Sequence, residues 1–155
     1  MSEMFRMPAP DPAAFAVLDA LPEWLAWGRR LVERWGAGTT YEVGPAGLRV
    51  RGTLYGRLVP AAALRAGEAR RVDLAAEPDL TPVVRTNGIG LPGYGAGWFR
   101  LAGGARALAF VTDRARLVHV PTAAGYALLL SADDPDGLVT ALRGLTRAGA
   151  GARAA

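Results

Sequence analysis

The sequence predicts a mainly β fold of the α+β class, in which an antiparallel barrel or sandwich is capped by a C-terminal α-helix and preceded by a helical extension. Three observations predict it: period-two alternation after Tyr41, glycine and proline turns between the alternating runs, and a capped amphipathic segment near the C-terminus. The predicted limits are residues 1–40 for the helical extension, 41–146 for the β domain and 147–155 for a disordered tail.

The N-terminal extension has a helical pattern after a poorly ordered start at residues 1–10. Asp11-Pro12 supplies an N-cap acceptor and a proline at the first helical position. A second helix is expected from about Pro22 to Trp35, with an apolar stripe that includes Trp24 and Trp35. The stripe fits packing on the protein's own body better than binding to a membrane surface, because the polar face carries both signs of charge.

The next segments have the features of strands. Tyr41–Val43 and Leu48–Arg51 flank a glycine–proline turn and predict a hairpin, and two more short strands are expected before residue 75. The stretch Val83–Leu101 then contains five glycines and a proline between two β-like ends. We interpret Gly88–Gly97 as a long glycine-rich loop between antiparallel strands.

The second half alternates more regularly. Strands are expected at residues 98–101, 106–111, 117–120 and 126–130, and their short connections predict antiparallel neighbours. Asp134, Pro135 and Asp136 begin a helix with an N-cap acceptor, a proline and a favourable charge in the first turn. Its predicted apolar stripe consists of Leu138, Ala141, Leu142 and Leu145.

Gly88–Gly93 matches the pattern G-x-G-x-x-G, which in a dinucleotide-binding unit leads from a strand into a helix. Here Pro92 lies inside the motif, and more glycines and aromatic residues follow it, so a helix is disfavoured. A kinase-type glycine loop lies between strands, but that site needs a lysine and the chain contains none. The motif therefore does not predict a nucleotide site.

Composition excludes several classes of function. The formal net charge of the 155 residues is +4, and the arginines are spread without the basic stripe that nucleic-acid binding usually shows. There is no cysteine for disulfide or thiolate chemistry. No stretch has the length and apolarity of a spanning helix, and the N-terminus lacks a signal-peptide pattern. A cytoplasmic protein is expected, without nucleic acid as a partner.

Several segments resemble the bacterial pleckstrin-homology-like (PH-like) domains. The similarity covers about Tyr41 to Leu145. The matching pieces are Arg85–Gly88, Gly93-Tyr94, Gly97–Phe99, Phe110–Asp113 and Leu130–Pro135. The resemblance implies a bent antiparallel barrel closed by the C-terminal helix, and a role in binding or scaffolding. Many bacterial relatives carry transmembrane helices beside the domain, whereas the N-terminal helices here are too short and charged to span.

No residue cluster predicts catalysis. A Ser-His-Asp triad would need His119, the only histidine, with an aspartate and either Ser2 or Ser131, and Ser131 lacks the G-x-S-x-G context of a nucleophile. Asp133, Asp134 and Asp136 are better explained by helix capping than by a cation. One histidine and no cysteine make a zinc site improbable. No metal, cofactor or catalytic residue is therefore predicted.

The sequence therefore predicts a non-enzymatic module that binds protein, either a second copy of itself or another chain. Sheet edges and the glycine-rich stretch are the expected contact surfaces. The predicted binding residues are Arg85 as a charged fork, Asn87 to order the glycine stretch and Tyr94 as a contact ring. The alternative is peripheral attachment to anionic membrane or lipid headgroups, through the Trp24/Trp35 helix or through Arg49 and Arg51.

Overall fold

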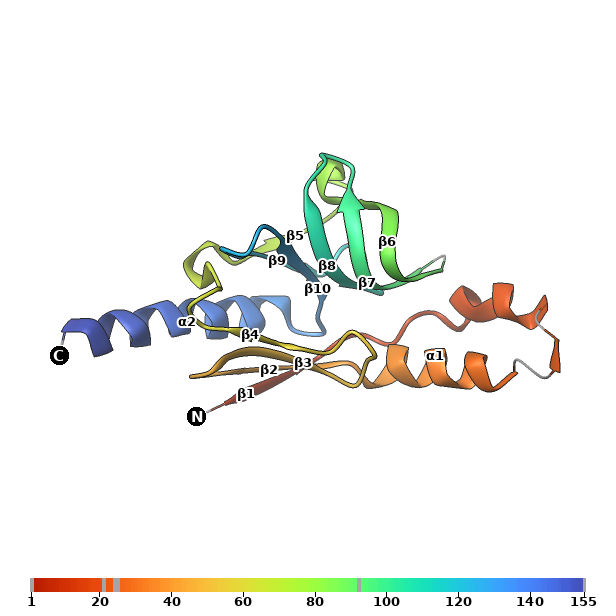
Figure 1. Ribbon diagram of the computed structural model, residues 1–155, viewed down its shortest axis with the longest axis horizontal. Coiled ribbons are helices and arrows are strands. Elements are labelled where there is room, and N and C mark those ends of the chain that lie inside the picture. Colours follow the sequence, from red (N-terminus) through yellow and green to blue (C-terminus); the bar gives the residue numbers. More distant parts are fainter. Residues whose placement is uncertain (1, 21, 24–25, 92, 155) are drawn as a thin grey trace.

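The computed structural model describes residues 2–20, 22–23, 26–91 and 93–154. Its strands form two sheets that face each other, with a long C-terminal helix towards one end and the N-terminal helices at the other (Figure 1). The predicted fold class, a mainly β sandwich capped by a C-terminal helix, is confirmed.

The first sheet has four strands in the order β1-β2-β3-β4, and every neighbouring pair is antiparallel. The strands are β1 (Glu3–Arg6), β2 (Thr40–Gly44), β3 (Gly47–Arg51) and β4 (Leu58–Pro60). The hairpin predicted around residues 44–47 is confirmed. The expectation that residues 1–10 are poorly ordered is wrong for residues 3–7, because β1 pairs with β2 and Met7, just beyond β1, is buried.

Within the described residues, the N-terminal extension contains the helices η1 and α1. A 3-10 helix, η1 (Pro12–Ala20), starts where the Asp11 side chain accepts a hydrogen bond from the Ala13 amide at 2.9 Å. The α-helix α1 runs from Ala26 to Gly38, several residues later than predicted, and Trp35 on it is half-buried. Trp24, the other tryptophan of the predicted stripe, lies outside the described residues.

The second sheet has six strands in the order β5-β9-β10-β8-β7-β6. Two further 3-10 helices, η3 (Ala66–Glu68) and η4 (Pro78–Leu80), flank its first strand. In chain order the strands are β5 (Arg70–Val72), β6 (Pro82–Leu91), β7 (Tyr94–Leu101), β8 (Arg106–Val111), β9 (Leu117–Pro121) and β10 (Ala127–Ser131).

The prediction that all neighbours are antiparallel is wrong for one pair. β10 lies between β9 and β8, antiparallel to the first and parallel to the second, with Ala127 opposite Ala107. The connection from β8 to β10 spans residues 112–126 and contains β9, so it has the length that a parallel crossover requires. The central position of β10 matches its nearly uniform apolar sequence, which is typical of a strand buried on both faces.

The glycine-rich stretch is not a loop. β6 and β7 pair over almost their whole length, from Pro82 opposite Leu101 to Leu91 opposite Tyr94. Between them the structure describes Gly93 in a turn, with a positive φ of 80°. Most of the glycines predicted to form a loop therefore lie within a long β-hairpin.

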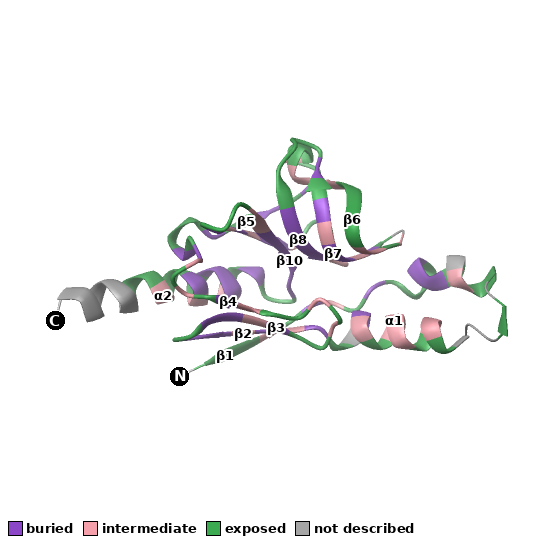
Figure 2. Ribbon diagram, in the orientation of Figure 1, coloured by how far each residue is buried: buried purple, intermediate pink, exposed green. Residues whose placement is uncertain are grey.

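The two faces of the six-stranded sheet bury separate apolar clusters. The inner face joins the first sheet and helix α2 in the main core, which contains large buried side chains of both sheets: Tyr41, Leu48, Tyr94, Leu108, Phe110, Leu128 and Leu130. The outer face holds a smaller cluster with Phe99 and Leu129, which Leu74 and Leu80 from the segment before β6 help to cover. Figure 2 shows the contrast between buried β8 and exposed β6.

Helix α2 (Pro135–Ala154) supplies the predicted cap. Asp134 accepts a hydrogen bond from the Gly137 amide at 3.0 Å, and Leu138 and Leu142 are fully buried in the main core. The helix continues to Ala154, so residues 147–154 are helical where a disordered tail was predicted for residues 147–155, and residue 155 lies outside the described residues. Alanine and arginine are among the best helix formers, which favours this continuation despite the glycines.

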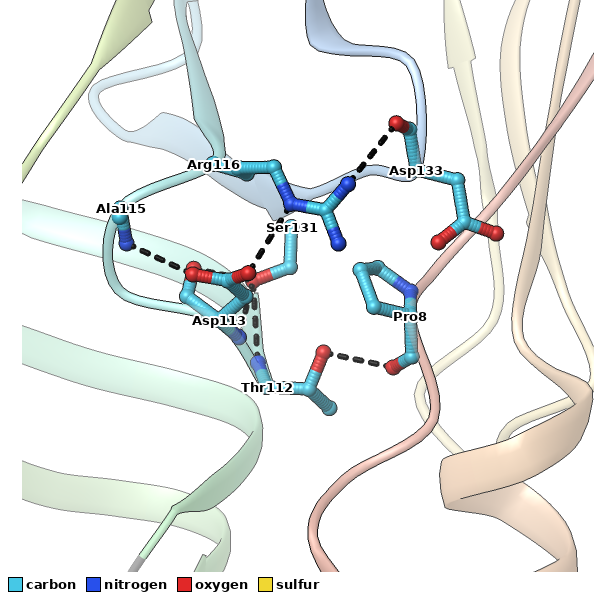
Figure 3. Close-up of polar contacts among 7 residues, drawn as sticks. All are labelled: Pro8, Thr112, Asp113, Ala115, Arg116, Ser131 and Asp133. Atoms are coloured by element: carbon cyan, nitrogen blue, oxygen red, sulfur yellow. Dashed lines mark hydrogen bonds and ion pairs between the residues drawn. The ribbon is translucent and has the colours of Figure 1, made fainter.

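A polar cluster ties the turn after β8 to β10 and to the N-terminal segment (Figure 3). The buried Ser131 hydroxyl accepts hydrogen bonds from the amides of Thr112 at 3.0 Å and Asp113 at 3.1 Å, and donates one to the Asp113 carbonyl at 3.0 Å. The Thr112 hydroxyl donates to the Pro8 carbonyl at 2.7 Å, and Arg116 bridges the Asp113 carboxylate and the Asp133 carbonyl.

His119 lies on β9, opposite Arg70 of β5 and Leu129 of β10. Burial and the nearby Arg70 guanidinium lower the pKa of its imidazole, while Glu77 acts in the opposite direction. Its Nδ1 atom is buried and has no hydrogen-bond partner among the described residues. The folded protein therefore favours the neutral form of His119.

Replacing Ser131 with alanine is expected to destabilise the fold by about 2–3 kcal/mol, because two amides lose their acceptor inside the polar cluster. Urea denaturation followed by tryptophan fluorescence measures the loss. Thr140→Ala is a matched control, since its exposed hydroxyl donates to a carbonyl within α2, and it should change stability by less than about 0.5 kcal/mol. Equal effects of the two substitutions would show that the Ser131 cluster contributes nothing special.

The free energy of unfolding should fall as the pH drops from 7 to 5. The pKa of His119 is lowered in the folded state, so the unfolded chain binds more protons once the pH passes below its own histidine pKa of about 6.5. The stabilisation is present above that pH and is lost as the pH falls towards the folded pKa. Denaturation of the parent and of His119→Gln at both pH values tests this, because the substitution should flatten the pH dependence. An unchanged slope would rule out His119 as its source.

Candidate functional site

Strand β6 forms one edge of the six-stranded sheet. It is ten residues long, pairs only with β7 within the described chain, and carries exposed valines at positions 83 and 84, at 57% and 52% of their possible surface. The register shifts at two places, between Pro82 and Val84 and between Arg85 and Asn87. Such bulges bend an edge strand and re-aim its side chains.

Glycines let β6 and β7 approach closely. Gly97 has a φ of 124°, and a Cβ atom there would lie 2.6 Å from the Asn87 carbonyl oxygen. On the other strand, a Cβ atom at Gly88 would lie 2.5 Å from the Ala96 carbonyl oxygen. Side chains at either position would push the strands apart, so these glycines hold the edge strand in place.

A second pair of glycines leaves part of the outer face of the hairpin without side chains. Gly90 and Gly95 are opposite each other, and the Phe99 ring lies beside both. A Cβ atom at Gly90 would be 3.8 Å from the Phe99 ring and 3.8 Å from Cδ of Arg85. The ring and the arginine stem therefore lie next to each other on a face without intervening side chains.

This cleared face is part of a groove of about 500 Å³. Its apolar lining includes Leu74, Phe99, Ala109 and Val111, and Val83 of β6 lies on its wall. The charged side chains among the described residues that line it are Arg85 and Arg114, both exposed. The groove thus combines an apolar surface with positive charge, directly beside the β6 edge.

The three predicted binding residues lie in different surroundings. Arg85 lines the groove, opposite Phe99. Asn87 is exposed and opposite Trp98, which packs against the main core, so its side chain belongs to the other face of the hairpin. Tyr94 borders the groove but is only 1% exposed, and its ring packs against Phe15 at a centroid distance of 5.9 Å.

The Tyr94 hydroxyl is buried without a hydrogen-bond partner among the described residues, and burial raises its pKa to about 12. The position of the Tyr94 side chain suits packing at the base of the hairpin. Sequence analysis did not identify Arg114 and Phe99 as neighbours of Arg85. Phe99 is buried between the less buried Trp98 and Arg100 along β7, but its pairing with Arg85 depends on bulges that no sequence pattern revealed.

The other candidates from sequence have structural contacts. The hydroxyl of Ser131 is saturated by backbone groups, since it donates one hydrogen bond and accepts two (Figure 3). Asp134 caps α2, and Asp136 pairs with Arg71 at 3.1 Å. Within the described residues, no group of three or more histidine, cysteine, aspartate or glutamate side chains is arranged to hold a metal ion.

Trp98 is at the centre of an aromatic and cationic cluster that sequence analysis missed. Its ring meets Tyr126 edge-on at 4.9 Å, and the guanidinium groups of Arg106 and Arg57 lie 4.4 Å and 5.5 Å from its centroid. Arg57 precedes β4 of the first sheet, whereas Trp98 and Arg106 lie on β7 and β8 of the second and Tyr126 immediately precedes β10 of that sheet. The cluster therefore joins the two sheets through cation–π contacts, each worth about 0.5–1 kcal/mol at an exposed site.

The features predicted for membrane attachment are only partly present. Trp27 of α1 is 65% exposed, but Arg29 on the same helix pairs with Asp19 and Glu33. Arg51 of β3 pairs with Glu42 at 3.2 Å, which offsets the charge proposed for a lipid headgroup. Among the described helices, none combines the length and apolar character needed to cross a bilayer.

Comparison with family models finds a match to the family described as bacterial PH domain over residues 39–146. No curated protein and no solved structure matches the chain. The matched range runs from just before β2 into α2, and so includes both sheets apart from β1. PH-like domains are generally non-catalytic modules for binding or scaffolding. The match covers more than half of the chain, which therefore belongs to the bacterial PH domain family.

Proposed function

We propose that this domain is a non-enzymatic module that binds another polypeptide chain by adding a strand of the partner to β6. The observation that carries the proposal is the length and exposure of the β6 edge beside an apolar groove. In strand addition, main-chain hydrogen bonds contribute affinity and pockets for alternate side chains contribute specificity. The β6 edge offers the main-chain hydrogen-bonding groups, and the groove offers the pocket for side chains.

The other sheet edges are less suitable for such pairing. β4 and β5 have three residues each, and β1 has four. β5 begins with two arginines, β4 ends in a proline, and β1 has a charged residue at each end. Short edges, charge and proline are the usual means by which proteins prevent unwanted edge pairing. β6 also has a proline, at its first position, and two bulges, but it is ten residues long and its one charged residue is Arg85.

The contacts of the serine and the histidine that could act in catalysis also agree with a binding function. Ser131 stabilises a turn, and His119 on β9 lies opposite Arg70 on the neighbouring strand β5, where Arg70 pairs with Glu77. The groove has apolar and cationic lining but no nucleophile paired with a base among its described residues. A surface of this kind can recognise a ligand, and nothing in it prepares a bond for cleavage.

The proposal is tested with peptides selected from a random displayed library against the full chain. Hydrogen exchange measured by mass spectrometry should show slower exchange within residues 82–91 when a selected peptide is bound. Val83→Ser should weaken binding about fivefold, because losing part of a valine contact costs about 1 kcal/mol.

Leu54→Ser is the matched control, since Leu54 is also exposed, at 65%, but lies between β3 and β4 of the first sheet. It should leave peptide affinity unchanged. Protection that appeared at α1 or at the β1 edge and not along β6 would contradict strand addition at this site.

A further inference from the structure

We infer that the β6 groove selects an extended acidic segment of another protein, with an apolar side chain and a carboxylate two residues apart. The inference rests on the proposed strand addition and adds the chemistry of the partner. Residues two apart on a strand point to the same face. An added strand would therefore present both side chains to the groove together.

The positive charge of the groove indicates that the partner segment is acidic. Arg85 and Arg114 are the charged residues among the described lining, and neither has a carboxylate partner within the part of the chain that the structure describes. Five of the other arginines are held in ion pairs among the described residues, and the remainder have no ion-pair partner there. Those with ion-pair partners are Arg29, Arg51, Arg70, Arg71 and Arg116. The groove thus retains two forked donors, each able to hold a carboxylate with paired hydrogen bonds.

The floor of the groove indicates that the partner segment also carries an apolar side chain. The Phe99 ring lies beside Gly90 and Gly95, and both glycines leave open the space that a side chain would fill. Arg85 stands directly opposite Phe99, with its stem beside the same glycine. An aliphatic side chain placed over the ring would therefore have a carboxylate neighbour within reach of the Arg85 guanidinium.

The same charges disfavour a second copy of this chain. Two β6 strands paired antiparallel would form one continuous sheet, with both grooves on the same face. Four arginines, Arg85 and Arg114 from each copy, would then line that face without an acidic residue among the described lining. The formal net charge of +4 per chain adds to this repulsion. An acidic partner removes the repulsion, and a copy increases it.

The test uses two fluorescein-labelled peptides of three repeats each, Val-Thr-Glu-Thr and Val-Thr-Gln-Thr, titrated into the full chain by fluorescence anisotropy. The glutamate peptide should bind about tenfold more tightly at low salt, and the difference should shrink as salt is added. Arg85→Gln and Arg114→Gln should each weaken the glutamate peptide about fivefold, and each should weaken it more than it weakens the glutamine peptide.

Arg65→Gln removes one exposed arginine away from the groove and should have no effect. Equal binding of both peptides, with slower hydrogen exchange in β6, would overturn the acidic preference and leave strand addition intact. Failure of both peptides to slow exchange in β6 would contradict strand addition as well.

Two further measurements separate other occupants. Co-sedimentation with phosphatidylserine vesicles that was lost in Arg85→Gln and Arg114→Gln, without any preference between the peptides, would assign the groove to a membrane surface. Light scattering that showed a dimer of the parent, and a monomer of Val83→Ser, would assign it to a second copy. Either result would overturn the inference. A monomer that prefers the glutamate peptide would support it.

Discussion

Burial of one face of the six-stranded sheet against the four-stranded sheet and α2 is the interaction on which the rest of the structure depends. Each fully buried aliphatic or aromatic side chain contributes about 1.5–3 kcal/mol. The main core takes such side chains from both sheets and from the helix. Strand positions are therefore set by which residues must face that core, and the outer face adapts to the result.

The outer face of the larger sheet is only partly covered, and this is where the candidate site lies. The segment from Leu74 to Leu80 closes over part of it, with the Gly103 amide donating to the Asp79 carbonyl at 2.8 Å. Beyond that cover the hairpin of β6 and β7 continues with glycine at alternate positions. Where glycines replace larger side chains the face is hollow, and this hollow lies beside the β6 edge at which strand addition is proposed.

Local patterns predicted the elements whose causes are local. Asp134 and Pro135 marked the start of α2, and the spacing of Leu138 and Leu142 marked its buried face. The order of the strands within the sheet could not be predicted from local patterns. The apolar run of β10 fits any central position, so only packing of the whole sheet decides that it lies between β9 and β8. Arg114 comes to the groove through that same arrangement, which is why alternation along single strands did not reveal it.

The glycines of β6 and β7 show why residue type alone misled the prediction. Glycine is unfavourable in strands because it has more conformational freedom to lose and no side chain to pack. In this hairpin the missing side chains are what allow the backbones to meet at Gly88 and Gly97, and what opens the space beside Phe99 at Gly90 and Gly95.

The same arrangement explains why G-x-G-x-x-G does not signal a nucleotide here. The chain continues from the motif into β7, so no helix N-terminus is present to hold a phosphate. The glycines of this edge strand lose conformational freedom on folding, and they leave an open face beside the strand. Departures from local strand preference of this kind are expected at functional sites. The glycine pattern is therefore consistent with the recognition proposed at β6, and it does not depend on the charges that surround the groove.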